Sequence, residues 1–361
     1  MTDYHQLTVK IKNEATRLGF NAVGIAAALP HPHYQAYKDW IAAAHHADMD
    51  YLARPDVLTK RGNPQKILAN CQRMIFLAMP YQPPQASIEQ QHKGKGRISA
   101  YAQTIDYHEV IWEKLAQLEQ FIREQTEEDL SLKSYVDTGP ILERSYASLA
   151  GIGVAGKNSC LIIPGLGSYF FLAEVLTDLE LPVDEPCTRD VCRNCHRCID
   201  ACPTGAILED RTIDASKCIS YLTIENKGHI PVALRKPIGS WVFGCDICQM
   251  VCPHNHSTAL DSNPLGDPLL TEWIDLEPLF SMDKDTFKAK FGPTALSRAK
   301  HTGLLRNAAI VLGNQKCQEA LPILKIHAEN ETDPAVKEAC LWAVEEISGQ
   351  PLDQPPSETN Q

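Results

Sequence analysis

Residues 192–203 read Cys192-Arg-Asn-Cys195-His-Arg-Cys198-Ile-Asp-Ala-Cys202-Pro203. In a run with this spacing, three thiolates on a tight loop wrap one [4Fe–4S] cluster, while the cysteine before the proline is a ligand of a second cluster. A second run, Cys245-Asp-Ile-Cys248-Gln-Met-Val-Cys252-Pro253, follows later in the chain, and Cys218 stands between the two. The pattern therefore predicts a ferredoxin-like module with two [4Fe–4S] clusters, over residues 181–262.

The two Cys-Pro ends allow each run to complete the cluster of the other run. The ligands predicted for cluster 1 are Cys192, Cys195, Cys198 and Cys252. Those predicted for cluster 2 are Cys202, Cys218, Cys245 and Cys248.

Two other uses of the cysteines fit less well. A structural zinc site would need two Cys-x-x-Cys pairs, and it would leave cysteines over and both Cys-Pro ends unexplained. Disulfides need an oxidising compartment, and the N-terminus has neither the basic and apolar regions of a signal peptide nor a twin-arginine pair. Of the isolated cysteines, Cys187 is interpreted as a spare, and Cys317 and Cys340 as small core residues.

Length and composition bound the protein class. The 361 residues suffice for two or three domains, and 44% hydrophobic with 22% charged residues is typical of a globular protein. No segment is long and apolar enough for a membrane span, so we expect a cytoplasmic protein. The net charge of −11 argues in general against nucleic acid as a partner.

The first part of the chain alternates helical and strand patterns. Helices are predicted from residues 7–18, 37–47 and 108–124, and strands from 20–26, 73–79, 132–136, 161–163 and 168–176. This alternation predicts an α/β (α+β) domain over residues 1–180. A Gly-x-Gly-x-x-Gly segment at 151–156 matches a dinucleotide fingerprint, but a helix and not a strand is expected to precede it.

The last part of the chain has a helical repeat. Residues 305–314 and 334–347 share a pattern in which Arg306 aligns with Lys337 and Ala309 with Cys340. Helical pairs that bury their faces against each other are typical of HEAT-like repeats, which we predict over residues 263–349. The polar, proline-rich residues 350–361 are predicted to be a disordered tail.

Positive charge gathers near the start of this helical region. Between residues 284 and 306 there are six Lys or Arg residues, and the nearby acids are Asp283 and Asp285. Such a segment indicates either a surface for phosphates or an ordinary solvated helix face, and charge alone does not separate the two.

Several motifs occur together in one order over nearly the whole chain. Besides the cysteines they are Asp106-Tyr-His108, Asp137-Thr-Gly-Pro, Gly156-Lys-Asn, Cys218-Ile-Ser-Tyr-Leu-Thr-Ile-Glu225 and Gly244-Cys-Asp-Ile-Cys-Gln. Together with the helical C-terminal region, they resemble the epoxyqueuosine reductase family. The resemblance implies a cytoplasmic, monomeric oxidoreductase with cob(II)alamin and two [4Fe–4S] clusters. Its expected substrate is tRNA with a GUN anticodon carrying epoxyqueuosine, and its electrons come from a low-potential donor.

The resemblance also implies roles for residues of the first domain. Asp137 matches the family's proton donor for the epoxide oxygen, although a helix N-cap before Pro140 is the alternative that spacing permits. Cobalamin contacts are expected from Arg61, Ala100, Asp137, Asn158, Ser168, Ser220, Asp246 and Ile247. Because Ile111 stands where Asp-x-His-x-x-Gly proteins have glycine, no histidine ligand to cobalt is expected from His108.

Contacts to tRNA are expected from cations of the later segments. These are Lys227, Arg235, Arg298, Lys300 and Arg306.

Three other functions remain open from the sequence. A cobalamin-dependent reductive dehalogenase shares both cofactor types, but it is exported and lacks the helical repeat. A non-catalytic iron–sulfur electron-transfer subunit would bind no cobalamin. A tRNA-binding scaffold with structural clusters would not need Asp137.

Overall fold

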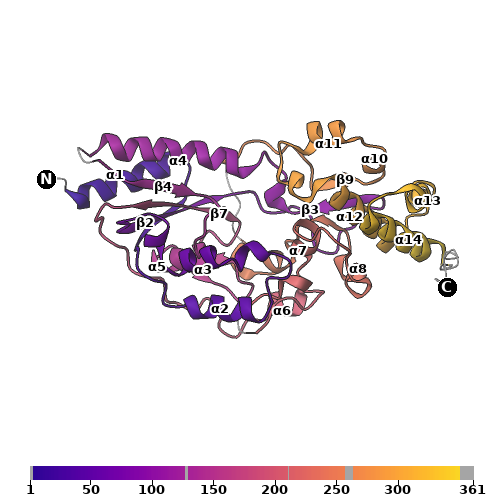
Figure 1. Cartoon of the computed structure of the whole chain (residues 1–361), viewed down its shortest axis with the longest axis horizontal. Helices are drawn as coiled ribbons and strands as arrows, with labels where there is room; N and C mark the ends of the chain where they lie inside the picture. The colour runs from indigo at the N-terminus through magenta and orange to yellow at the C-terminus, as the bar shows by residue number, and fades with distance from the viewer. Residues whose placement is uncertain (1–2, 127–128, 210, 257–262, 350–361) are drawn as a thin grey trace. The chain divides into compact units, whose positions relative to one another are not determined.

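The computed structural model describes residues 3–126, 129–209, 211–256 and 263–349 (Figure 1). The chain divides into two compact units, each built from three separate segments. Unit 1 comprises Met1–Gln85, Thr104–Ser216 and Asp246–Pro268, and unit 2 comprises Ala86–Gln103, Lys217–Cys245 and Leu269–Gln361. The units thus interleave along the chain, whereas the sequence predicted consecutive modules. The predicted tail at 350–361 lies outside the described residues.

Unit 1 is built on a four-stranded antiparallel sheet with the order β1-β2-β7-β4. Its strands are β1 (Ala22–Ala27), β2 (Arg73–Pro80), β4 (Leu132–Tyr135) and β7 (Phe170–Thr177). The two central strands, β2 and β7, are apolar along almost their whole length, as expected for strands covered on both faces. The registers set Glu174 of β7 opposite Phe76 on one side and Tyr135 on the other.

Helices cover both faces of this sheet (Figure 1). The helices α1 (Tyr4–Arg17) and α4 (Tyr107–Glu124) lie along one face, and α5 (Glu143–Leu149) packs against the other. Side chains cap two of these helices: Asp3 accepts hydrogen bonds at the start of α1, and Asp106 accepts one from the His108 backbone N–H, 3.1 Å away, at the start of α4. The predicted helices and strands of this region are confirmed, with ends displaced by a few residues.

Short elements complete unit 1. They are α2 (Tyr34–Ala42), α3 (Pro55–Gly62), β5 (Val154–Ala155), β6 (Leu161–Ile162), α6 (Arg197–Ala201) and α9 (Ile247–Met250). As predicted, the glycine-rich segment from Gly151 follows a helix, α5, so it lacks the strand that a dinucleotide site requires.

Unit 2 combines a small sheet with helices. The sheet has the order β8-β3-β9, with β8 parallel and β9 antiparallel to β3. Its strands are β3 (Lys95–Ile98), β8 (Trp241–Phe243) and β9 (Trp273–Asp275). The helices are α7 (Ile219–Ile224), α8 (Val232–Ile238), α10 (Glu277–Phe280), α11 (Lys284–Phe291), α12 (Lys300–Asn314), α13 (Leu321–Asn330) and α14 (Pro334–Ser348).

The buried helix α12 is the centre of unit 2. It packs against α14, α7, α8 and β8, and almost every residue from Gly303 to Gly313 is buried. Gly313 permits this packing, because a β-carbon there would lie 2.7 Å from the Trp342 ring of α14. Cys317 and Cys340 are buried in this core, as predicted. None of the described helices is long and apolar enough to cross a bilayer.

Candidate active site

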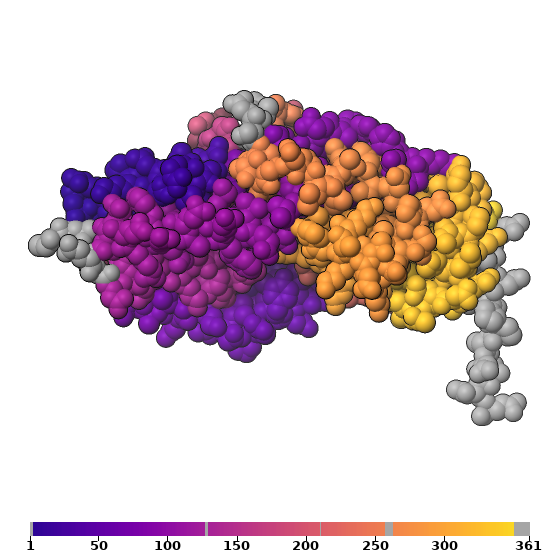
Figure 2. Space-filling view, turned by 90° about the horizontal axis from the view of Figure 1, so that it is seen from above, coloured from indigo at the N-terminus to yellow at the C-terminus, as the bar shows by residue number. Residues whose placement is uncertain are grey.

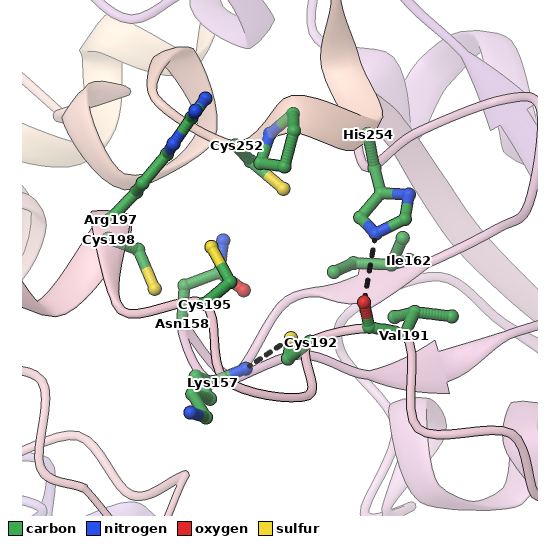
Figure 3. Close-up of a pocket in the computed structure, with 11 residues that line it drawn as sticks. Lys157, Asn158, Ile162, Val191, Cys192, Cys195, Arg197, Cys198, Cys252 and His254 are labelled. Atoms are coloured by element: carbon green, nitrogen blue, oxygen red, sulfur yellow. Dashed lines mark hydrogen bonds between the residues drawn. The ribbon is translucent and has the colours of Figure 1, made fainter.

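Four of the predicted cluster cysteines line one small pocket of unit 1. Cys192 and Cys195 come from the loop that leads into α6, Cys198 from the first turn of α6, and Cys252 from the Cys-Pro end of the second run. Figure 3 shows their four sulfur atoms pointing into the same space. The structure therefore brings together the four residues that the sequence assigned to cluster 1.

The surroundings of this pocket suit thiolate ligands. The Lys157 backbone N–H donates to the Cys192 Sγ over 3.4 Å, and His254 contacts the Val191 carbonyl across the pocket wall (Figure 3). Burial, and then the neighbouring Cys192, raises the pKa of Cys198 to about 11, and burial also raises the pKa of Cys252. A bound iron cluster supplies the positive charge that stabilises the thiolates. The donor set, with one backbone N–H aimed at a sulfur, fits a [4Fe–4S] cluster.

The residues predicted for cluster 2 are divided between the units. Cys202 and Cys248 belong to unit 1, and Cys218 and Cys245 to unit 2. The Ala206 backbone N–H donates to the Cys202 Sγ over 3.3 Å. Within the described ranges, no three His, Cys, Asp or Glu side chains are arranged around a single metal ion. A cubane is larger than one ion, so its thiolates need not converge on one point.

A much larger cavity, of about 700 Å³, opens in unit 1. This volume is within the range of cofactor sites. Its wall is a mixture of aromatic, apolar and a few charged side chains. Those that carry the chemistry are Tyr37, Arg61, Tyr107, Asp137, Glu143, Arg144, Ser168, Phe171, Arg211 and Gln249.

Asp137 is held at the cavity wall by Tyr107. The Tyr107 hydroxyl donates to Asp137 Oδ2 over 2.7 Å, and the Tyr107 ring is stacked on Phe171 with centroids 3.9 Å apart. Asp137 has a φ of +56°, a backbone conformation that residues with side chains rarely adopt and that is often found at functional positions. The next helix, α5, has Leu142 and not Asp137 as its N-cap residue. The helix-capping alternative for Asp137 is therefore wrong.

Two further carboxyl groups lie near Asp137. Glu143 lies at the cavity wall, and its Oε1 is shielded from solvent without a hydrogen-bond partner among the described residues. Glu174 is 0% exposed, and neither of its carboxylate oxygens has such a partner there. Burial, followed by the charge of Asp137, raises the pKa of Glu143 to about 8. Burial and the charges of Glu143 and Asp137 raise the pKa of Glu174 well above its ordinary value.

Arg61, a predicted cobalamin contact, is a cation whose charge acts on these acids. Its Nη1 donates to the Ile141 carbonyl over 2.8 Å, and its guanidinium lies over the Tyr37 ring, 5.4 Å from the centroid. Its charge lowers the pKa of both Glu143 and Glu174, but less than burial raises them. The cavity wall therefore holds one carboxyl group, that of Glu143, that keeps its proton at neutral pH.

The buried Glu174 should affect stability in a pH-dependent way. A carboxyl with a higher pKa in the folded than in the unfolded state makes stability fall as pH rises above its unfolded value, about 4.5 here. In the Glu174→Gln variant, the side chain at this position cannot ionise. The difference in melting temperature between this variant and the wild type should therefore be several degrees larger at pH 8 than at pH 5. Thermal unfolding of the full chain tests this, with the exposed Glu180→Gln as control. A difference for Glu174→Gln that stays constant with pH would contradict the raised pKa.

The other predicted cobalamin residues are more scattered. Ser168 lies at the large cavity, where its carbonyl accepts from Gln249 Nε2 over 2.9 Å. Asn158 lines the cysteine pocket instead, and it is buried beside Cys160. Asp246 and Ile247 are buried at the start of α9 and are not among the described residues of the cavity wall.

Ala100 and Ser220 belong to unit 2. Ala100 is buried in a short turn after β3. Ser220 lies in α7, two residues after Cys218. Their predicted contact with cobalamin stays a prediction.

Two of the cations predicted to contact tRNA are internal. Arg306 is 2% exposed, and its guanidinium donates to the carbonyls of Asn226, Gly228 and Leu222 over 2.6–2.9 Å. Arg235 is 1% exposed, and it pairs with Glu338. The prediction that these two residues bind phosphate was wrong, because helix packing buries both, and a charge pattern in the sequence does not show burial.

Of the remaining predicted cations, Lys227 follows α7, and Arg298 and Lys300 lie just before and at the start of α12. The Lys227 ammonium donates to the carbonyls of Ile224 and Arg298 over 2.6 and 2.8 Å, so it ties the turn before α12 to α7. Lys300, the next cation along, is exposed and has a φ of +59°. Lys284, Lys288 and Lys290 are also exposed on α11, whose segment is orange in the space-filling view of Figure 2.

Sequence reasoning missed Tyr107 and Glu143 as members of the cavity wall, and it missed Glu174 as a buried acid outside that wall. An acid in the middle of an apolar strand was a usable signal for Glu174, because ionisable residues are rarely fully buried. Glu143 belongs to the same segment as Asp137, yet nothing in that segment indicates that its carboxyl group is buried. Tyr107 is brought to Asp137 by packing between α4 and the sheet.

Two family models match the chain. One, described as "Epoxyqueuosine reductase QueG, DUF1730", matches residues 61–138. The other, a "4Fe-4S double cluster binding domain", matches residues 191–255, which include all eight predicted cluster cysteines. The chain thus contains a double-cluster domain within the predicted module.

Similar curated proteins cover most of the chain. Epoxyqueuosine reductase from Aliivibrio fischeri is 40% identical over 88% of this chain and 86% of its own length. The Escherichia coli protein of the same name is 36% identical over 95% of this chain and 90% of its own.

Solved structures show the same fold. A crystal structure of epoxyqueuosine reductase with an epoxyqueuosine-modified tRNA-Tyr stem loop has a TM-score of 0.87 and 30% identity, and the match covers 96% of this chain and 91% of that one. A Bacillus subtilis structure, described as having an aspartate catalytic loop swung out of the active site, has a TM-score of 0.85 and 30% identity, with the same coverage. A reductive dehalogenase is only distantly similar, with a TM-score of 0.42.

Proposed function

The chain belongs to the epoxyqueuosine reductase family, and from this premise we propose that it reduces epoxyqueuosine in tRNA to queuosine. The observation that carries the proposal is the pair of sites in unit 1: a pocket with four thiols, and a separate cavity of about 700 Å³ at which Asp137 is held by Tyr107. The first can carry electrons, and the second can hold a substrate and a proton donor. An electron-transfer subunit or a tRNA-binding scaffold would not need the second site.

Cobalamin is the proposed cofactor of the large cavity. The fit rests on the cavity's volume and on its wall, which combines aromatic and apolar side chains with charged and polar ones. Arg61 and Ser168 would contact it from this wall, and cobalamin, when bound, supplies a strongly reducing cobalt centre. Asn158, at the cysteine pocket, is proposed to lie between the cluster and the cofactor. Residues 1–180 are accordingly proposed as the cobalamin-binding module.

Asp137 is the proposed acid. Removing the epoxide oxygen as water consumes two electrons and two protons, so a proton donor must face the oxygen. The Tyr107 hydroxyl orients the Asp137 carboxyl at the cavity wall, and a relative is described as having an aspartate on its catalytic loop. A φ above zero at Asp137 also supports a loop held in place for function.

The substrate is proposed to be tRNA with a GUN anticodon, and the reaction is placed in the cytoplasm with a low-potential electron donor. A relative was crystallised with a modified tRNA stem loop. Residues 263–349 are proposed to form a HEAT-like region for tRNA, in which α12, α13 and α14 pack on one another. Cluster 2 and a monomeric state belong to the same proposal.

The proposed reaction has a direct test. Epoxyqueuosine-containing tRNA is incubated anaerobically with the reconstituted protein, cobalamin and a low-potential reductant, and its nucleosides are analysed by mass spectrometry. Conversion to a nucleoside lighter by one oxygen is expected. Unchanged epoxyqueuosine, with both clusters and cobalamin bound, would refute the proposal.

Lys300 is the proposed phosphate contact of α12. It is exposed, its backbone is in a conformation that favours glycine, and Lys227 fixes the turn before it, which also carries Arg298. Lys300→Ala should weaken tRNA binding and reduce the slope of log K against log salt by about 1. The control is Lys325→Ala, an exposed lysine of α13. Equal slopes for Lys300→Ala and the wild type would exclude a phosphate contact at Lys300.

A further inference from the structure

The reaction needs two protons, and Asp137 can deliver one of them in each turnover. When the epoxide opens, one C–O bond breaks and its oxygen takes the first proton. When the second C–O bond breaks, the carbon–carbon double bond forms, and the oxygen leaves as water only with a second proton. The two electrons come from the donor that the proposed function already requires. The source of the second proton is therefore a separate question about this cavity.

Glu143 has the position that a second donor requires. It lines the same cavity as Asp137, and the Asp137 backbone N–H hydrogen-bonds to its carboxyl group, so the two acids are fixed relative to each other. Glu143 Oε1 is shielded from solvent and has no hydrogen-bond partner among the described residues. No ion pair stabilises a negative charge on this oxygen there, which favours the neutral acid.

The surroundings of Glu174, in the interior next to Glu143, do not stabilise the negative charge of a carboxylate. Glu174 lies on β7, on the same face of the strand as Phe170 and Leu172 of the cavity wall, because alternate residues of a strand share a face. It is completely buried, and both of its oxygens lack partners in the described part of the chain. Glu174 itself does not line the cavity, so it is not placed to reach a substrate.

We propose that Glu143 is the second proton donor of the reaction, which delivers the proton with which the oxygen leaves as water. This assignment rests on the proposed function and adds a catalytic residue to it. The charged groups that act on Glu143 are Asp137, which favours its neutral form, and Arg61 and Arg144, which oppose it. Burial outweighs the two arginines, and the resulting pKa of about 8 leaves the proton on Glu143 at neutral pH and available for transfer.

The first test needs no turnover. Infrared spectra of the full chain are recorded from pH 6 to pH 10, and the carbonyl band of neutral carboxylic acids is followed. A band that persists at pH 7 and titrates near pH 8 is expected in the wild type, and Glu143→Gln should lose that component. Glu180→Gln, with an exposed carboxyl, should keep it. If the Glu143→Gln variant shows the same neutral-acid band as the wild type, the proposal is overturned.

The second test uses single turnovers of the reconstituted enzyme at pH 7. Glu143→Gln should slow the loss of oxygen by roughly 10²-fold or more with unchanged tRNA affinity, since it holds no transferable proton. The matched control is Glu174→Gln, which makes the same change at a buried carboxyl away from the cavity wall, and it should retain the wild-type rate. Equal losses in both variants would show a structural effect and overturn the proposal.

The two tests also separate this proposal from the proposed function. If the wild type itself forms no queuosine, the proposed reaction fails, whatever the infrared spectra show. If the wild type is active and Glu143→Gln is equally fast, the reaction stands, and the assignment of Glu143 is wrong.

Discussion

Asp137→Asn is expected to lower the rate of epoxide reduction by roughly 10²–10⁴-fold, the usual contribution of a positioned general acid. The amide has nearly the same shape as the acid and can still accept the hydrogen bond from Tyr107, so the fold and the cavity should persist. Nucleoside mass spectrometry over time measures the rate, and tRNA binding is measured in parallel. A large loss of rate with intact binding is the expected pattern.

Two further variants test whether the loss of rate is specific to the Asp137 carboxyl group. Tyr107→Phe removes the hydroxyl that orients Asp137 but leaves the ring stacked on Phe171, so it should cost much less activity than Asp137→Asn. Asp39→Asn, at an exposed position of α2, should behave as the wild type. Wild-type rates in Asp137→Asn would mean that another group protonates the oxygen first.

Cys252→Ser is expected to remove cluster 1 and abolish turnover. Cys252 is the ligand that comes from the second run, and without it the three cysteines of the first run hold an incomplete set. Iron and sulfide per chain should fall by about half, because cluster 2 keeps its own four ligands. Iron analysis and electron paramagnetic resonance of the reduced protein measure the loss.

Cys187→Ser is the matched control for this prediction. Cys187 is a nearby cysteine of unit 1 that does not line the cysteine pocket, so its variant should retain all iron and full activity. Full iron content in Cys252→Ser would contradict the assignment of Cys252 to cluster 1. Zinc in place of iron in the wild type would contradict both clusters.

The mechanism divides the work between two sites of different chemistry. The cysteine pocket offers thiols and a backbone N–H, which suit a metal cluster and electron transfer. The large cavity offers Asp137, which Tyr107 holds at its wall, and Glu143, whose surroundings favour its neutral form, and this suits proton transfer. A reduction that consumes both electrons and protons needs both kinds of site.

Local patterns in the sequence were sufficient to propose the cluster ligands and to predict most of the secondary structure. The loop that holds a cubane is short, so cysteine spacing alone indicates which residues share a cluster. The pocket brings Cys192, Cys195, Cys198 and Cys252 to one place, as this prediction requires. Helix and strand predictions from hydrophobic periodicity succeeded for the same reason, since that periodicity reflects which face of an element is covered.

Charge patterns in the sequence were a poor guide to which cations are exposed. Arg235 and Arg306 belong to segments that are rich in cations, yet both are buried and bonded to carbonyls or to Glu338. Whether a cation meets solvent depends on how helices pack, and the pattern along one helix does not determine that.

By itself, the sequence predicted the cysteine ligands, four of which one pocket brings together, and determined the order of helices and strands, because spacing and periodicity are local properties of the chain. Only the tertiary structure brought Asp137, Tyr107, Glu143 and Glu174 together, from a loop, α4, α5 and β7. The register of β7 with β2 and β4 buries Glu174, and the packing of α4 sets Tyr107 against Asp137. Burial and the approach of like charges, which raise the pKa of an acid, exist only once distant segments have met.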